Sequence, residues 1–307
     1  MAQSTLDSFF GNKQLHVFNL NKKGNAQWCT SLKKNTIVRQ IKAPHLITFT
    51  SDINLVNLSE FEIYDKNIAV RSLLISNLQK SIRRNEPDVA IATAYKLVQY
   101  KEGTTHLLRR LCIIIFEDKY SCFESIAEHF STLVWLMATE KGWEGWIDWV
   151  LGLVNYICDK NYKYVNHKED IDMNWSHNQY VCSILLRVRY GGMKCDTRLL
   201  KNCAKKIVKK DPIKFAKKAE KFALVKPNTN LIILPAAVDF HCVPRIVKNI
   251  ASEYPMYTQS NIRAAIWIYS SSLRYNCTIQ KENEVWRDIK KDVLDFQEHY
   301  IRNIDIK

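Results

Sequence analysis

From about Phe61 onward, hydrophobic residues recur with the three-to-four-residue spacing of amphipathic helices. The first apolar stripe predicts one helix and consists of Ile68, Leu73, Leu74, Leu78 and Ile82. Glu86-Pro87-Asp88 predicts the end of this helix and the start of the next, because proline is favoured in a first helical turn. Two further helices are predicted at Val89–Gln99 and Thr105–Phe116, separated by Lys101-Glu102-Gly103.

A local concentration of tryptophan follows, and its spacing is also helical. It consists of Trp135, Trp143, Trp146 and Trp149, with Leu153 and Ile157 on the same face as the last two. Large rings at this spacing are usually core residues, although they can also form a platform on which nucleic-acid bases stack. Two closing helices are predicted at Ile262–Tyr269 and Val285–Phe296. The polar stretch Asn161–Ser176 is the expected boundary between two helical halves.

The segment before Phe61 differs in both charge and pattern. No acidic residue lies between Ser8 and Ser51, whereas seven cations are spread through it: Lys13, Lys22, Lys23, Lys33, Lys34, Arg39 and Lys42. This composition predicts a basic, extended tether. Short apolar patches at Val17-Phe18, Trp28 and Leu46–Thr50 are either strands or docking motifs, because periodicity does not separate these options over such short runs.

Composition narrows the class of protein. The chain has 307 residues, 47% of them hydrophobic, which is enough for one large domain or two ordinary ones. The formal net charge of +14 favours a polyanionic partner, and we expect nucleic acid rather than a membrane surface. No apolar run approaches the roughly 18 residues of a membrane span and the first residues do not resemble a signal peptide, so we expect an intracellular protein. Nine cysteines without a Cys-x-x-Cys pair are expected to be reduced thiols, and no metal or other cofactor is predicted.

The first ten residues have the pattern of a docking peptide. Gln3, Leu6 and Phe9 are three apart, so a 3₁₀ turn would place them on one edge, with Phe10 beside Phe9. The string resembles the PIP box, Q-x-x-[ILM]-x-x-[FY]-[FY], by which replication and repair proteins bind the sliding clamp, proliferating cell nuclear antigen (PCNA). The resemblance implies that Gln3 enters a polar pocket, that Leu6 and the two rings fill a hydrophobic cleft, and that Lys13 favours an acidic rim.

A second resemblance covers roughly residues 60–160. The stretch Leu78–Asp118 contains Lys80–Arg84, a helix start at Asp88–Ala94, and Leu108–Leu111 followed by Glu117-Asp118. It resembles the helical collar domain of clamp-loader-like AAA+ ATPases of the RarA and Werner-interacting group. The resemblance implies an assembly surface and a possible homo-oligomer, and a generic helix pair with solvated polar ends is the alternative. No glycines are spaced as a G-x-x-x-x-G-K-[ST] phosphate loop requires.

These features predict a mainly α fold with a short extended or β-containing N-terminal region. We expect a PIP-box peptide at 1–12, a basic tether with possible short strands at 13–60, a collar-like helical domain at 61–170 and a basic helical domain at 171–307.

The strongest electrostatic signal lies between Lys194 and Lys226, where twelve cations face only three acids. Arg198, Lys201 and Lys205 follow one helical face. Such a single-sign face is costly without a polyanion because like charges repel, so we expect sequence-tolerant contacts with phosphates. A nuclear-import signal and an ordinary solvated surface are the alternatives. The candidate nucleic-acid-binding residues are Lys194, Arg198, Lys201, Lys205, Lys206, Lys209, Lys210, Lys214, Lys217, Lys218 and Lys221.

Asp239 and His241 form the best candidate for chemistry. Alternation along an extended segment would place both on one side, as in a carboxylate-oriented imidazole. No recognisable catalytic or metal-binding motif accompanies them, so a structural histidine is the favoured interpretation and no catalytic residue is assigned.

Together the patterns predict a non-enzymatic accessory protein of DNA replication or repair, nuclear if the host is eukaryotic, that binds a PCNA-type clamp and DNA. A clamp-recruited repair enzyme, either a nuclease or a glycosylase, and an RNA-binding protein are the alternatives.

Overall fold

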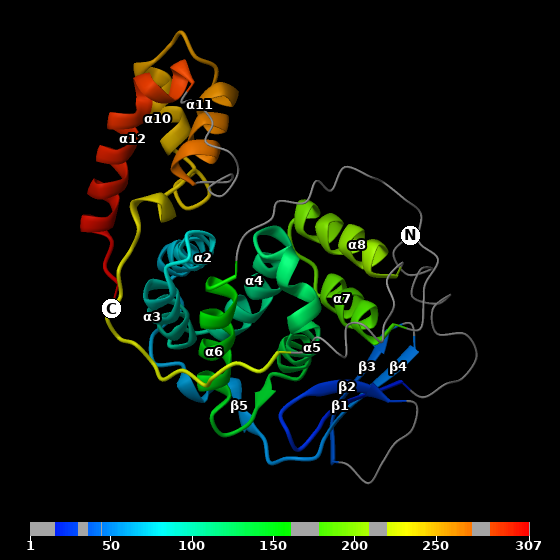
Figure 1. The fold of residues 1–307 in the computed structure, drawn as a ribbon. Helices are drawn as coiled ribbons and strands as arrows, with labels where there is room; N and C mark the ends of the chain where they lie inside the picture. The colour runs from blue at the N-terminus through cyan, green and yellow to red at the C-terminus, as the bar shows by residue number, and fades with distance from the viewer. Residues whose placement is uncertain are drawn as a thin grey trace. The chain divides into compact units, whose positions relative to one another are not determined.

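The computed structural model describes residues 16–29, 36–43, 45–160, 178–208, 220–271 and 283–306, and these are mainly helical with a small sheet near the N-terminus (Figure 1). The mainly α prediction is therefore confirmed. The described chain forms two compact units. The first consists of described residues within the ranges 1–60, 111–146 and 165–221, and the second of described residues within 61–110, 147–164 and 222–307. The PIP-box residues Gln3, Leu6, Phe9 and Phe10, and Lys13 after them, lie outside the described residues.

The first unit contains a four-stranded sheet of β1 (His16–Leu20), β2 (Ala26–Cys29), β3 (Thr36–Ala43) and β4 (His45–Ser51). The strand order is β2-β1-β4-β3. β1 pairs antiparallel with β2 and parallel with β4, whereas β3 and β4 form an antiparallel pair. The β-branched and aromatic residues of β1 and β4 suit this pleated, half-buried surface.

Helix α5 (Phe123–Thr139) joins this sheet to the core of the first unit. The indole Nε1 of Trp135 donates a hydrogen bond to the carbonyl of Phe18 at 2.9 Å, and the amide of Ala26 donates to the hydroxyl of Thr132 at 2.9 Å. Phe18 is fully buried and stacks on Trp28, with ring centroids 4.4 Å apart. The described part of the predicted tether is thus folded, and its apolar patches are strands rather than docking motifs.

Four more short elements and two helices complete the first unit. They are β5 (Val56–Asn57), β6 (Lys141–Gly142), η1 (Leu58–Phe61), η2 (Tyr120–Cys122), α7 (Gln179–Arg189) and α8 (Lys194–Val208). β5 pairs antiparallel with β6. The hydroxyl of Ser183 on α7 accepts a hydrogen bond from the indole of Trp28 at 3.1 Å, so α7 is fastened to the sheet.

The second unit begins with α2 (Ile68–Arg83) and α3 (Pro87–Val98), which lie where the apolar stripes predict them. Asn67 caps α2 through a side chain that accepts the amide of Val70, and Pro87 occupies the first turn of α3. Helix α4 (Gly103–Glu117) belongs to the second unit up to Arg110 and to the first unit from Leu111, and α6 (Trp146–Cys158) belongs to the second unit from Ile147 onward. Trp135, Trp146 and Trp149 are all buried, so they are core residues and not a base-stacking platform.

The rest of the second unit consists of η3 (Pro235–Ala237), α10 (Ile246–Glu253), α11 (Gln259–Ala265), η4 (Ile266–Ser270) and α12 (Glu284–Asn303). The last four elements share a core that includes Ile250, Ile262, Ile266, Trp286 and Ile289. The closing helices are therefore present where the sequence predicts them.

The observed units divide the chain differently from the predicted ranges 61–170 and 171–307, because each unit is assembled from three separate segments. Contacts between segments distant in the chain, such as the hydrogen bond from Trp135 to the carbonyl of Phe18, cannot be read from local composition. The predicted boundary at 161–176 lies outside the described residues. Among the described helices, none combines the length and apolar character that crossing a bilayer requires.

Truncating Phe18 tests whether the N-terminal strands are part of the folded core. We expect Phe18→Ala to lower the free energy of unfolding by about 3–5 kcal/mol, because it removes a buried ring between Trp28 and Phe49. The measurement is chemical denaturation followed by tryptophan fluorescence. Ile37→Ala on β3 is the matched control, since this side chain is 54% exposed and should change stability little. Equal stability of both variants would contradict the assignment.

Candidate functional site

Helix α8 presents one face to the core of the first unit and a cationic face to solvent. Leu200, Cys203, Ala204 and Ile207 are buried, and burial raises the pKa of the Cys203 thiol to about 12. The cations of the described basic segment are exposed at Lys194, Arg198 and Lys201 and half-buried at Lys205 and Lys206. The apolar stripe thus fixes which side of the helix faces outward.

The acidic residue of α8 does not join this outer face. Asp196 lies in the first turn and is 8% exposed, beside Gly192 in the turn that precedes the helix. An acid near a helix N-terminus interacts favourably with the helix dipole. The exposed charged side chains of α8 are therefore all positive.

The structure places the remaining sequence-predicted cations as follows. Lys221 is exposed. Lys209, Lys210, Lys214, Lys217 and Lys218 lie outside the described residues. A single helix of the first unit thus carries five of the eleven predicted nucleic-acid-binding residues.

Two other cations of the first unit, Arg39 on β3 and Arg189 at the end of α7, bond to backbone carbonyls. The guanidinium of Arg189 donates to the carbonyl of Lys42 at 3.1 Å, and that of Arg39 donates to the carbonyl of Ala138 at 2.6 Å. Arg39 also lies 4.0 Å from Glu140, which offsets part of its charge. Arg39 is distant from α8 in the chain, so a run of cations does not reveal it, whereas Arg189 lies just before the Gly191-Gly192 turn that leads into α8.

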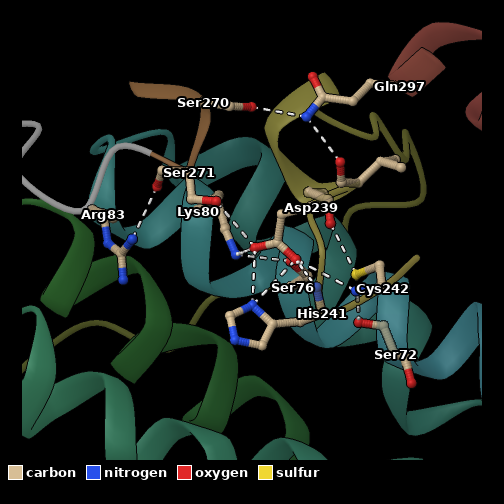
Figure 2. A network of polar contacts seen from close by, with 12 residues as sticks. Ser72, Ser76, Lys80, Arg83, Asp239, His241, Cys242, Ser270, Ser271 and Gln297 are labelled. Carbon is tan, nitrogen blue, oxygen red and sulfur yellow. Dashed lines mark hydrogen bonds and ion pairs between the residues drawn. The ribbon is translucent and has the colours of Figure 1, made fainter. Parts of the chain in front are cut away.

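The second candidate, Asp239, is the centre of a polar network in the second unit (Figure 2). Its carboxylate is fully buried. The ammonium of Lys80 on α2 lies 2.6 Å from Oδ2, and the hydroxyl of Ser271 donates to the same oxygen at 3.1 Å. Oδ1 accepts the backbone amide of His241 at 2.8 Å. The carboxylate thus holds α2, the segment after η3 and the end of η4 together.

The electrostatics of this network fit a structural ion pair. Burial by itself would raise the pKa of Asp239, but the Lys80 charge and the hydrogen bond from His241 outweigh it, so its pKa is held well below the ordinary value. The ammonium of Lys80 also donates to the hydroxyl of Ser76 at 2.9 Å. Burial and the adjacent carboxylate raise the pKa of the Cys242 thiol to about 11, which disfavours the nucleophilic thiolate.

His241 differs from the rest of the network in its exposure. Its side chain is 52% exposed, and Nδ1 lies 3.3 Å from Oδ1 of Asp239. Asp239 and His241 therefore lie together, but through a turn in which the carboxylate accepts the His241 amide, and not through the extended segment that the sequence suggested. The sequence missed Lys80, which lies 159 positions earlier, because the burial of an ion pair depends on the tertiary fold.

The two arginines at the end of α2, Arg83 and Arg84, also bond to the chain at the end of η4. Arg83 is buried and donates to the carbonyl of Ser271 at 2.9 Å, and Arg84 donates to the carbonyl of Ser270 at 2.9 Å. Figure 2 shows Arg83 beside Lys80 in the same network. The stretch Lys80–Arg84 is therefore not the solvated helix end that the generic alternative supposed.

Within the described parts of the chain, no cluster of three or more His, Cys, Asp or Glu side chains has a geometry suited to a metal ion. Comparisons with protein-family models, curated proteins and solved structures gave no match to this chain.

The buried pair predicts a specific dependence of stability on pH. A carboxylate whose pKa is depressed on folding stabilises the protein above its unfolded pKa, near 3.8, and this contribution is lost as the pH falls below it. Asp239→Asn should lower the free energy of unfolding at pH 7 by about 3–5 kcal/mol, because Lys80 is left buried without its counter-ion. It should also flatten the loss of stability on acidification.

The measurement is urea unfolding of the wild type and the variant at several pH values from about 2.5 to about 7, a range that extends from below to above the ordinary aspartate pKa. Asp295→Asn on α12 is the control, because this carboxylate is exposed. If Asp239→Asn and Asp295→Asn both retain wild-type stability at pH 7, the assignment of Lys80 and Asp239 as a stabilising ion pair is wrong.

Proposed function

We propose that this chain is a non-enzymatic accessory protein of DNA replication or repair that binds DNA phosphates through α8 and a PCNA-type sliding clamp through its N-terminal peptide. The observation that carries the proposal is the outer face of α8. Its exposed charged residues, Lys194, Arg198 and Lys201, are cations, whereas Asp196 is buried. A surface of one charge sign is the expected complement of a nucleic-acid backbone.

Binding through such a face is driven by the release of counterions from the nucleic acid. Each neutralised phosphate contributes about −0.9 to the slope of log affinity against log salt concentration for B-form DNA. Contacts of this kind are tolerant of sequence, because phosphates carry no base information. The α8 surface is therefore suited to retention on DNA rather than to the selection of a site.

The clamp contact rests on the resemblance of Gln3–Phe10 to the PIP box. Burial of Leu6, Phe9 and Phe10 in a partner would contribute about 1.5–3 kcal/mol for each side chain, offset by the ordering of the peptide, which is consistent with micromolar affinity. Two modest contacts in one chain reinforce each other, because binding at one raises the effective concentration at the other. The combination favours retention on clamp-loaded DNA, in the nucleus if the host is eukaryotic.

The collar-like character of the helices between residues 60 and 160 belongs to the same proposal. In the clamp-loader-like ATPases the collar mediates assembly, and here it would supply a surface for a homo-oligomer. The packed positions of Lys80 and Arg83 support a defined helical domain in this region.

A clamp-recruited repair enzyme remains the competing hypothesis because His241 is half exposed beside a buried carboxylate. Nuclease or glycosylase activity on duplex DNA that is abolished by His241→Ala would support that hypothesis. Preference for RNA over DNA of the same length at equal salt would instead support an RNA-binding protein.

Charge reversal on α8 tests the phosphate contacts. We expect Arg198→Glu/Lys201→Glu to weaken binding to duplex DNA and to reduce the magnitude of the salt slope by about two, because two phosphate contacts are lost. The measurement is fluorescence anisotropy of a labelled duplex across a series of salt concentrations. Lys291→Glu/Arg302→Glu on α12 carries the same change in net charge and is the control. Equal slopes in the two double variants would assign the α8 cations to ordinary solvation.

Truncation of the two N-terminal rings tests the clamp contact. Phe9→Ala/Phe10→Ala should weaken binding to purified PCNA at least about tenfold, since each lost ring removes more than the roughly 1.4 kcal/mol that a tenfold change requires. Isothermal titration of the clamp with the full chain gives the affinity. Ser4→Ala/Thr5→Ala alters the same peptide outside its anchor positions and should bind as the wild type does. Unchanged affinity of the phenylalanine variant would remove the clamp from the proposal.

A further inference from the structure

The last helices of the second unit form a small cluster of their own. α10, α11 and α12 lie side by side and share one hydrophobic core (Figure 1). α11 continues directly into η4, which has π-helical hydrogen bonding, so residues 259–270 form one uninterrupted helical segment. Single π-helical turns occur frequently at functional sites.

α10 and the segment formed by α11 and η4 are joined by a turn of five residues, Tyr254–Thr258. Each of the two packs one face on the core. The inward residues are Ile246, Val247 and Ile250 on α10, and Ile262, Ala265 and Ile266 on the following segment. The two helices are thus joined by a short turn and packed on one core, and the residues of α11 that do not enter this core include the exposed Gln259, Ser260 and Arg263.

The turn at Tyr254–Thr258 is fixed by a helix cap on α11 and by hydrogen bonds to α12. Thr258 caps α11 by accepting the amide of Asn261 at 3.2 Å. The hydroxyl of Tyr257 donates to Asp288 on α12 at 2.6 Å, and this bond raises the pKa of Tyr257 to about 12. Tyr254 makes the same kind of bond to Asp292. These contacts fix the direction in which α11 leaves the turn and occupy two acids of α12.

The outward face of α11 carries groups that bond to base edges. Gln259, Ser260 and Arg263 are exposed, and Trp267 on the same segment is 43% exposed. The guanidinium of Arg263 also lies over the ring of Phe240, 5.7 Å from its centroid. Glutamine pairs with adenine, arginine pairs with guanine, serine bonds to either, and an apolar group contacts the thymine methyl in the major groove. In a recognition helix, the residues near the N-terminus contact base edges in the major groove. Gln259, Ser260 and Arg263 occupy such positions in α11.

The flanking charges suit a phosphate backbone. Arg245 and Lys248 are exposed at the start of α10. From residue 244 to residue 271 the basic residues are Arg245, Lys248 and Arg263, and the acidic residue is Glu253. In helix–turn–helix proteins the first helix crosses the backbone while the second enters the groove, so Arg245 and Lys248 lie at the helix that would meet phosphates.

We propose that α10 and α11 form a helix–turn–helix element that binds duplex DNA, with Gln259, Ser260 and Arg263 contacting base edges in the major groove. This site lies in the second unit and is separate from α8, so it does not depend on the clamp contact or on the phosphate contacts proposed above. It adds sequence preference to a protein whose α8 surface has none.

Selection from a pool of random duplexes tests the element directly. The full-length protein carrying Arg198→Glu/Lys201→Glu is used, so that sequence-tolerant binding through α8 is reduced. We expect a recurring sequence to be enriched, and anisotropy titration should show that Gln259→Ala and Arg263→Ala each weaken binding to the enriched duplex about 5- to 100-fold. Affinity for a scrambled duplex of the same composition should change little.

Arg302→Ala on α12 is the matched control, because it removes an exposed arginine of the same helical cluster that is paired with Glu298. Circular dichroism establishes that each variant is folded, and Ser260→Ala replaces any variant that is not. Failure to enrich a sequence, or equal losses for the enriched and scrambled duplexes, overturns the proposal. Binding of a protein partner that Gln259→Ala weakens, without enrichment of DNA, would assign the face to protein recognition instead and also overturn it.

Discussion

The buried ion pair of Lys80 and Asp239 is the interaction on which the second unit depends. It joins α2 to the segment after η3, while Ser271 and the amide of His241 satisfy the remaining capacity of the carboxylate. Gln297 on α12 adds a bond to the carbonyl of Val238 at 2.8 Å. Loss of one partner would leave a buried charge uncompensated, which typically costs several kcal/mol. The pair therefore fixes the start of the segment that carries α10, α11 and α12.

The environment of Asp239 also bears on its candidacy as a catalytic residue. A general base or nucleophile needs free lone pairs and a pKa near the working pH. Asp239 instead has a depressed pKa and accepts bonds from Lys80, Ser271 and the His241 backbone. The functional interpretation accordingly moves to the surface, where α8 and α11 present polar faces fixed by the hydrophobic residues behind them.

The spacing of apolar residues predicted the helices and their buried faces, because both depend on residues close together in the chain. The helices at 68–83, 87–98 and 284–303, and the burial of Trp146 and Trp149, follow from apolar spacing. Parallel pairing of β1 with β4 and the contact of Phe18 with Trp135 depend on segments far apart in the chain, so composition suggested a tether where the structure has a sheet. For the same reason the basic face of α8 was predictable from Arg198 and Lys201, whereas Lys80 beside Asp239 was not.

The central claim is that the cationic face of α8 contacts DNA. Lysine acetylation of the full chain, read by mass spectrometry with and without a saturating duplex, tests it at single residues. The account predicts that Lys194 and Lys201 are protected by DNA, whereas Lys101, an exposed lysine of the second unit, remains reactive. Equal reactivity of Lys194 and Lys201 with and without DNA would contradict the account.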